Sequence, residues 1–166
     1  MKVLPEELMS ILRFLMLLSL VVWIGGIIFF AFVLAPTVFR VLPTHQLAGN
    51  VVSRSLALLH GIGISCGILF IATSMINSAV VTGSAQPFAA RHVLVYLMIL
   101  LTLVSMFAVG ARMEALKKDM VMIDEVPQND ARRVEFNQLH VWSTRLEGTV
   151  LLMGLAVIFL AARRMT

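Results

Sequence analysis

Two long charge-free stretches constrain this chain more than any other feature. Residues 14–39 are 26 residues without Asp, Glu, Lys or Arg, and residues 55–90 are 36. A helix needs about 20 mostly apolar residues to cross a hydrocarbon layer of roughly 30 Å, where its backbone polar groups must pair within the segment. The sequence therefore predicts membrane-spanning helices. The composition agrees, because 60% of the 166 residues are hydrophobic and only 13% are charged, about half the usual share of charge in a soluble protein.

We predict an all-α integral membrane protein in which four transmembrane helices form a bundle, as a single domain over residues 1–166. The spans are expected at approximately 14–39, 56–81, 93–111 and 141–162. The last charge-free run, 148–162, has only 15 residues, so this helix must begin earlier and include Arg145 and Glu147 near the membrane boundary. The first run is longer than the 7 to 15 residues of a signal-peptide core, which predicts a permanent span.

The segment between the third and fourth spans is the only extensive polar region of the sequence. Residues 112–147 carry 13 of the 22 charges. An apolar stripe at helical spacing runs through the first part of the segment: Met113, Leu116, Met120 and Ile123. We predict a long charged helical hairpin, with its helical segment over 112–140. The hairpin is either simply solvated or a docking surface for a protein partner.

Local signals divide this hairpin into two helices. Glu114 and Lys118 have the i, i+4 spacing of a stabilising ion pair. Pro127 ends the first helix, because proline lacks the N–H that a helix interior uses. Asn129 or Asp130 is expected to cap the next helix, which continues into the fourth span.

The distribution of Lys and Arg predicts an orientation. The side of the first and third loops carries seven: Arg40, Arg54, Arg112, Lys117, Lys118, Arg132 and Arg133. The opposite side carries five: Lys2, Arg13, Arg91, Arg163 and Arg164. Because positive residues favour the cytoplasmic side, we expect a bacterial cell (inner) membrane protein with its long third loop in the cytoplasm and both termini outside.

Ionisable residues inside apolar segments are costly to place and are therefore candidates for function. A polar seam runs along the fourth helix at spacings of four, three, four and three: Arg133, Asn137, His140, Thr144 and Glu147. The second and fourth spans run in the same direction, so His60 and His140 are expected at similar depth. We predict a shallow polar pocket bounded by Pro36, Arg54, His60, His140 and Glu147.

Two uses of this pocket are open. Facing imidazoles could ligate haem iron or, with a carboxylate, a transition metal. Alternatively the residues are structural, each histidine bonding a neighbouring helix or solvent, and Glu147 pairs with a nearby arginine: Arg133, Arg145 or Arg54. We predict no cofactor, with haem or a metal held by His60 and His140 as the alternative. The remaining histidines, His45 and His92, are expected on the wet surface.

Small and large residues of the first two spans predict close packing. Gly25 and Gly26 in the first span, and Gly63 and Gly67 in the second, allow helix backbones to approach closely. Trp23 lies centrally in its span and is expected to pack against a neighbouring helix. The methionines recur at helical spacing, which favours core packing over copper binding.

No catalytic motif is present, so the sequence favours a non-enzymatic protein without deciding the question. The leading class is a structural or regulatory membrane protein that acts through its charged loop and the pocket beneath it. A haem- or metal-binding redox protein and a small-solute or metal transporter are the alternatives. The lipid bilayer is the expected partner, nucleic acid is not, and self-association and a protein partner at 112–140 stay open.

Three blocks of sequence resemble a known family. They are residues 23–39 (WIGGIIFFAFVLAPTVF), residues 47–56 (LAGNVVSRSL) followed by His60, and residues 136–140 (FNQLH) followed by Ser143. Along nearly its whole length the chain resembles the transmembrane protein 205-like family, four-span membrane proteins with a domain of unknown function. It is less similar to copper-resistance D proteins and four-helix membrane protoporphyrinogen oxidases, whose histidine pattern it matches only in part. The resemblance implies a four-helix membrane fold and assigns no activity.

Overall fold

The computed structural model is all-helical over the residues that it describes, 6–120 and 125–163. The elements in chain order are α1 (Glu6–Phe29), the π-helical segment η1 (Phe30–Leu34), α2 (Ala35–Val41), α3 (His45–Thr82), α4 (Ala90–Val104), the π-helical segment η2 (Ser105–Gly110), α5 (Ala111–Met120) and α6 (Ala131–Ala162). Because η1 and η2 join their neighbours without a break, these elements form four long helices.

Each of the four long helices in the described ranges has the length and apolar character needed to cross a membrane. They run over Glu6–Val41, His45–Thr82, Ala90–Met120 and Ala131–Ala162. Several extend past the apolar runs that predicted them. α3, for example, begins at His45 rather than near Leu56, because the Thr44 side chain caps it by accepting a hydrogen bond from the Leu47 amide at 3.2 Å.

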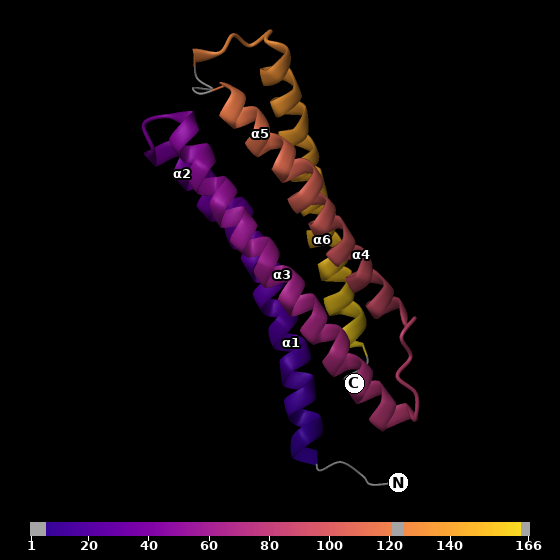
Figure 1. Ribbon diagram of the computed structural model, residues 1–166. Helices are drawn as coiled ribbons and strands as arrows, with labels where there is room; N and C mark the ends of the chain where they lie inside the picture. Colours follow the sequence, from indigo (N-terminus) through magenta and orange to yellow (C-terminus); the bar gives the residue numbers. More distant parts are fainter. Residues whose placement is uncertain (1–5, 121–124, 164–166) are drawn as a thin grey trace.

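The helices pack as two neighbouring pairs. α1 lies along α3 and α4 lies along α6, and contacts of α3 with α4 and of α1 with α6 join the pairs (Figure 1). The start of α1, the turn from α3 to α4 and the end of α6 lie at one end of the molecule, and the turn after α2, the end of α5 and the start of α6 lie at the other. α3 and α6 therefore run in the same direction, as the topology argument from the sequence requires.

The core is apolar, and Trp23 lies at its centre. The cluster of buried hydrophobic residues is Leu20, Trp23, Ile24, Ile27, Phe70, Val95, Met98, Val150 and Val157. Trp23 is 2% exposed and packs against Gly63 and Gly67 of α3. A Cβ at Gly63 would lie 2.8 Å from Trp23 Cδ1, and one at Gly67 would lie 2.7 Å from Trp23 Cζ3. The two glycines thus make room for the indole, as their spacing suggested.

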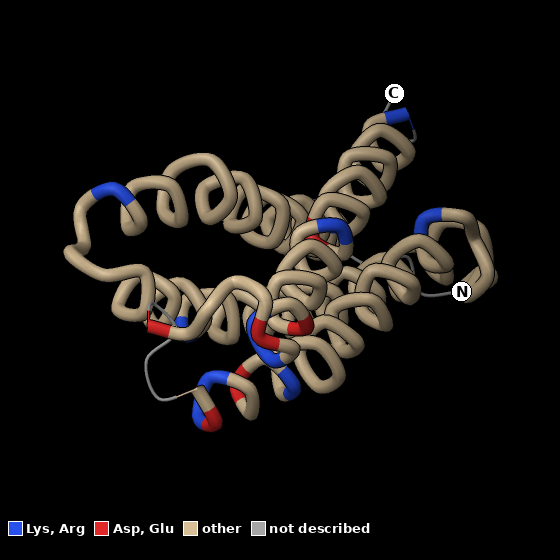
Figure 2. The backbone as a smooth tube through the Cα atoms, turned by 90° about the horizontal axis from the view of Figure 1, so that it is seen from above, with Lys and Arg blue, Asp and Glu red and all other residues tan. Residues whose placement is uncertain are grey.

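In the charged segment, the structure confirms one of the two predicted N-caps of α6. Asp130, one of the two predicted N-caps, begins α6 by accepting a hydrogen bond from the Arg132 amide at 2.8 Å. Leu116 and Met120 are buried and Met113 is half-buried, whereas Ile123, the last residue of the predicted stripe, lies outside the described residues. Figure 2 shows most of the charged positions gathered where α5 and the start of α6 lie.

One predicted ion pair in this segment is wrong. Glu114 pairs with Lys117, at 2.8 Å between Nζ and Oε1, rather than with Lys118. The same Lys117 Nζ donates to Ser53 Oγ at 2.6 Å and to Gly49 O at 3.4 Å, both on α3. Contacts with a neighbouring helix decide which lysine turns inward, and helix spacing alone does not contain that information. Lys117 thereby joins α5 to the start of α3.

Candidate functional site

A buried polar pair joins the middle of α3 to α6. His60 Nε2 lies 2.5 Å from Glu147 Oε1, and the two side chains are 5% and 14% exposed. His60 is fifteen residues from the start of α3 and Glu147 sixteen residues from the start of α6, so both lie well inside long apolar helices. We call these two residues the His60–Glu147 pair. It is the strongest candidate for a functional site, because intramembrane ionisable groups are rare unless they serve a function.

A third residue reaches this pair from the neighbouring helix. Ser105, which is 2% exposed, donates a long hydrogen bond of 3.5 Å from its Oγ to Glu147 Oε1. Ser105 is the first residue of η2, where the helix widens to i→i+5 hydrogen bonding. Such π-segments are rare and often occur at functional sites. Three of the four long helices therefore meet at one carboxylate.

The two side chains of the pair are joined by one hydrogen bond. It links an imidazole nitrogen and a carboxylate oxygen at 2.5 Å. In apolar surroundings, removing one partner leaves the other buried without compensation. If either residue exchanged its partner for another ligand, the connection between α3 and α6 would change.

A larger cavity of about 320 Å³ lies between the starts of α3 and α6, beside α5. We call it the α3–α5–α6 cavity. Its lining includes Phe39, His45, Gln46, Gly49, Val52, Ser53, Met113, Lys117, Arg133, Phe136, Asn137 and His140. Three residues of the predicted polar seam thus face it from α6. Along α3 and α6, the cavity comes first and the His60–Glu147 pair follows on the same helix faces.

The structure distributes the residues of the predicted polar pocket over several places. His60 and Glu147 come together. His140 is exposed and lines the α3–α5–α6 cavity. Pro36 and Arg54 are exposed, and the carbonyl of Pro36 accepts a hydrogen bond from Arg40 Nε at 3.4 Å.

Glu147 is thus partnered by a histidine rather than by any of the arginines considered from the sequence. Arg133 donates to the carbonyl of Val126, near the beginning of α6. Arg145 lies over the ring of Trp142, with its Cζ 5.6 Å from the ring centroid. Both arginines are therefore engaged within or beside α6, and the buried carboxylate is left to His60 and Ser105 of the neighbouring helices.

The two histidines proposed as a ligand pair occupy different levels. His60 contacts Glu147, and Glu147 is seven residues beyond His140 on α6, a rise of about 10 Å. Among the described residues, no group of three or more His, Cys, Asp or Glu side chains is placed to hold a metal ion. The residues present therefore do not fit a metal site, nor a haem held between two facing imidazoles.

A second buried polar cluster, which we call the Arg91–His92 cluster and which includes Ser74 and Ser78, was missed from the sequence. His92, expected on the surface, is 0% exposed, which corrects that prediction. Its Nδ1 donates to Gln86 O at 2.9 Å, since a carbonyl can only accept, and its Nε2 lies 2.8 Å from Ser74 Oγ. Arg91 is 6% exposed and donates to Ser74 Oγ at 2.8 Å and to Ser78 Oγ at 2.5 Å.

This second cluster closes the turn between α3 and α4. The signal that could have found it is the pair of serines four residues apart near the end of an apolar helix, followed across a short turn by Arg91 and His92. Hydroxyls at that spacing share one helix face, and polar groups buried in an apolar protein need partners. The cluster lies at the end of the molecule opposite the α3–α5–α6 cavity.

Comparison with known families adds one finding. Residues 18–121, more than half of the chain, match the family described as Domain of unknown function (DUF4149). The chain belongs to the DUF4149 family. The matched DUF4149 region contains His60, Ser105 and the Arg91–His92 cluster, and it ends just after α5, so Glu147 and His140 on α6 lie outside it. Comparisons with curated proteins and with solved structures gave no significant match.

Proposed function

We propose that this DUF4149 protein is a four-span protein of the cell (inner) membrane with a structural or regulatory role. We further propose that the His60–Glu147 pair is its functional site. Four apolar helices of spanning length support the location. The long charged segment at 112–140, taken as a helical hairpin in the cytoplasm, is the part that meets a protein partner. The similarity to transmembrane protein 205-like proteins belongs to this proposal.

One observation carries the proposal: the 2.5 Å contact between His60 Nε2 and Glu147 Oε1 in the apolar interior. Breaking a buried pair of this kind by removing one partner costs about 3 to 5 kcal/mol. The pair therefore favours one arrangement of α3 and α6 strongly over others. A cation or a partner that competes for Glu147 would release this preference, which is the property a regulatory element needs.

The charged segment is positioned to respond to such a change. Lys117 ties α5 to α3 through Ser53, and Arg112 ties α5 to α6 through a bidentate contact with Glu135, at 2.7 and 2.9 Å. A movement of α3 against α6 would therefore act on one or both of these connections. The His60–Glu147 pair and the surface at 112–140 are thus mechanically connected through α5.

The cofactor-binding alternative has less support from the geometry. Glu147 contacts Nε2 of His60, and His140, the second candidate ligand, lies about 10 Å from Glu147 along α6. A visible spectrum of the purified protein tests this directly. A Soret band that disappears in both His60→Ala and His140→Ala would reverse the order of the two proposals.

The test of the His60–Glu147 pair is a double-mutant cycle in detergent. His60→Ala and Glu147→Ala should each lower the free energy of unfolding by about 3 kcal/mol, and the double variant by much less than the sum, because each single change leaves a buried polar group without its partner. Thermal unfolding measures the stability. Arg145→Ala, on the exposed face of α6, is the matched control and should have a small effect.

Hydrogen exchange on the same variants tests the regulatory role. In Glu147→Ala, the amides of α5 and of the first three turns of α6 should exchange faster than in the wild type, although they lie away from the substitution. If the faster exchange is confined to the helix turns around residues 60 and 147, the pair is only a local structural contact and the regulatory proposal fails.

A further inference from the structure

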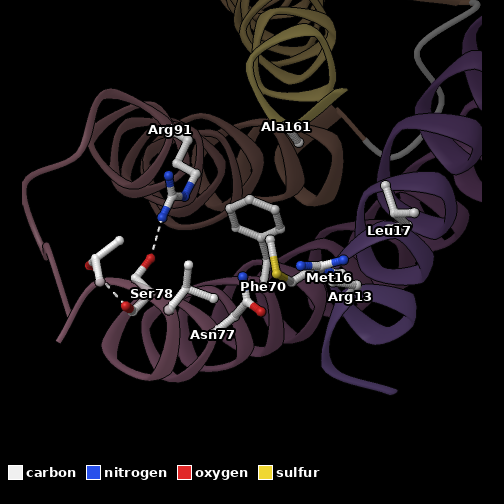
Figure 3. Close-up of a pocket in the computed structure, with 10 residues that line it drawn as sticks. Arg13, Met16, Leu17, Phe70, Asn77, Ser78, Arg91 and Ala161 are labelled. Carbon is white, nitrogen blue, oxygen red and sulfur yellow. Dashed lines mark hydrogen bonds between the residues drawn. The ribbon is translucent and has the colours of Figure 1, made fainter. Parts of the chain in front are cut away.

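A second cavity, of about 120 Å³, lies at the end of the molecule where α1 begins and α6 ends (Figure 3). Its lining is Arg13, Met16, Leu17, Phe70, Asn77, Ser78, Val81, Thr82, Arg91 and Ala161. We call it the Arg13–Arg91 cavity. Its volume is several times the roughly 10 to 15 Å³ that one water molecule needs, so it has room for a small polar group.

The polar lining of this cavity is positive. Figure 3 shows Arg91 of α4 and Arg13 of α1 on different sides of the cavity, with Phe70 and Asn77 of α3 between them. None of the described lining residues is acidic. Ser74 and Ser78 hold the buried guanidinium of Arg91 in place, at 2.8 and 2.5 Å. Such an arrangement favours an anionic group, and arginine pairs with phosphate especially well.

Asn77 supplies a second and independent indication of a ligand. Its Oδ1 atom is buried and has no hydrogen-bond partner within the described chain. A buried carbonyl oxygen without a partner is uncommon and costly. Since this oxygen can only accept a hydrogen bond, a ligand that satisfies it must bring an O–H or N–H donor into the cavity.

Apart from Thr82, the rest of the lining is apolar: Met16, Leu17, Phe70, Val81 and Ala161. A ligand that suits the whole cavity therefore combines a negative phosphate, a hydrogen-bond donor close to it and hydrocarbon. A phospholipid with a glycerol headgroup has all three. A soluble phosphate ester also has the phosphate and the donor, but it has no hydrocarbon to pack against the apolar wall.

We propose that the Arg13–Arg91 cavity binds the headgroup of an anionic phospholipid of the phosphatidylglycerol type. The phosphate lies between Arg13 and Arg91, a headgroup hydroxyl donates to Asn77 Oδ1, and the acyl chains follow the apolar surface of α1 and α3. Basic pockets between transmembrane helices are known to suit anionic headgroups. The inference rests on the proposed membrane location but not on the His60–Glu147 pair.

Native mass spectrometry of the full chain in detergent tests this inference. Three ligands are titrated separately: phosphatidylglycerol, phosphatidylcholine and glycerol phosphate. Phosphatidylglycerol should bind tightest. Phosphatidylcholine, which has the phosphate but no donor for Asn77, and glycerol phosphate, which has no acyl chains, should each bind at least about ten-fold more weakly.

Two variants keep the fold while changing the cavity. Arg13→Gln removes a charge from an exposed side chain, and Asn77→Asp adds a negative charge of nearly the same shape between two arginines. Each should weaken phosphatidylglycerol binding about ten-fold or more, with an unfolding temperature near that of the wild type. Arg40→Gln, an arginine at the opposite end of the molecule, is the control and should bind as the wild type does.

Three results would overturn the inference. They are equal binding of phosphatidylglycerol by both cavity variants and the control, equal binding of phosphatidylcholine and phosphatidylglycerol, and binding of glycerol phosphate as tight as that of the lipid. The last would assign the cavity to a soluble phosphate ester. None of these results would alter the double-mutant cycle of the His60–Glu147 pair, so the two proposals fail separately.

Discussion

At the scale of single residues, the glycines of α3 show how one side chain sets the distance between two helices. Gly63 and Gly67 lie under the indole of Trp23, whereas a Cβ added at Gly61 would have nothing within 4 Å. All three glycines look alike in the sequence. Only the position of Trp23 on the facing helix separates those that are needed for packing from the one that is not.

We expect Gly63→Ala and Gly67→Ala each to lower the free energy of unfolding by about 1 to 3 kcal/mol, because the added methyl group collides with a rigid ring in a packed core. Gly61→Ala is the matched control on the same helix. It should leave stability unchanged or raise it by up to about 1 kcal/mol through its better helix propensity. Unfolding in detergent measures all three, and equal effects at the three positions would contradict the packing argument.

At the scale of elements, the ends of the helices are set by local chemistry and their interiors by neighbours. Thr44 caps α3 and Asp130 caps α6, and Gly83 ends α3 in the left-handed region at φ 73°, which glycine adopts without strain. In contrast, η2 adds a wide turn at Ser105–Gly110 that shifts the faces of α4 and α5 relative to each other. Residues at α-helical spacing on either side of such a segment therefore no longer lie on one face of the helix.

The cap of α6 should depend on pH in a predictable direction. Hydrogen bonds from Arg132 lower the pKa of Asp130 from 3.8 to about 2. Since the folded pKa is depressed, the stabilising cap is fully present above pH 3.8 and is lost as the pH falls through about 2. The amides of the first turn of α6 should lose protection against hydrogen exchange over this range.

Asp130→Asn provides the comparison for this experiment, because asparagine caps helices about as well as aspartate and does not titrate. The ratio of exchange rates between wild type and Asp130→Asn removes the intrinsic effect of pH on exchange. A ratio that stays constant between pH 4 and pH 2 would show that the Asp130 carboxylate does not stabilise the helix start.

At the scale of the whole molecule, the two ends of the bundle have different chemistry. One end carries α5, the start of α6 and most of the charge, with the α3–α5–α6 cavity beneath them. The other end carries the Arg91–His92 cluster and the Arg13–Arg91 cavity. The His60–Glu147 pair lies between them. If the four long helices cross the membrane as proposed, these two ends face opposite compartments.

Cysteine labelling tests this arrangement. In a Cys66→Ala background, Ser84→Cys in the α3–α4 turn and Asp119→Cys near the end of α5 should react with a membrane-impermeant maleimide from opposite sides of the membrane. The excess of Lys and Arg predicts that residue 119 is cytoplasmic and residue 84 is outside. Labelling of both positions from the same side would contradict the four-span topology, and the reverse sidedness would overturn only the orientation. The native Cys66, in the middle of α3, should not react from either side.

The sequence by itself determined the number of long helices and the polarity of the segment between the last two, and it narrowed the cap of α6 to Asn129 or Asp130, because chain length without charge, helical spacing and capping are local properties. It also selected His60 and Glu147 as candidates, since ionisable groups stand out in apolar runs. Only the tertiary structure decided that these two residues bond to each other, that Lys117 rather than Lys118 turns inward, and that His92 is buried. Each of those outcomes depends on how one helix is rotated and shifted along its axis relative to its neighbour. The packing of Trp23 on its glycines and the π-segments set this rotation and shift. Residue spacing within one helix does not contain that information.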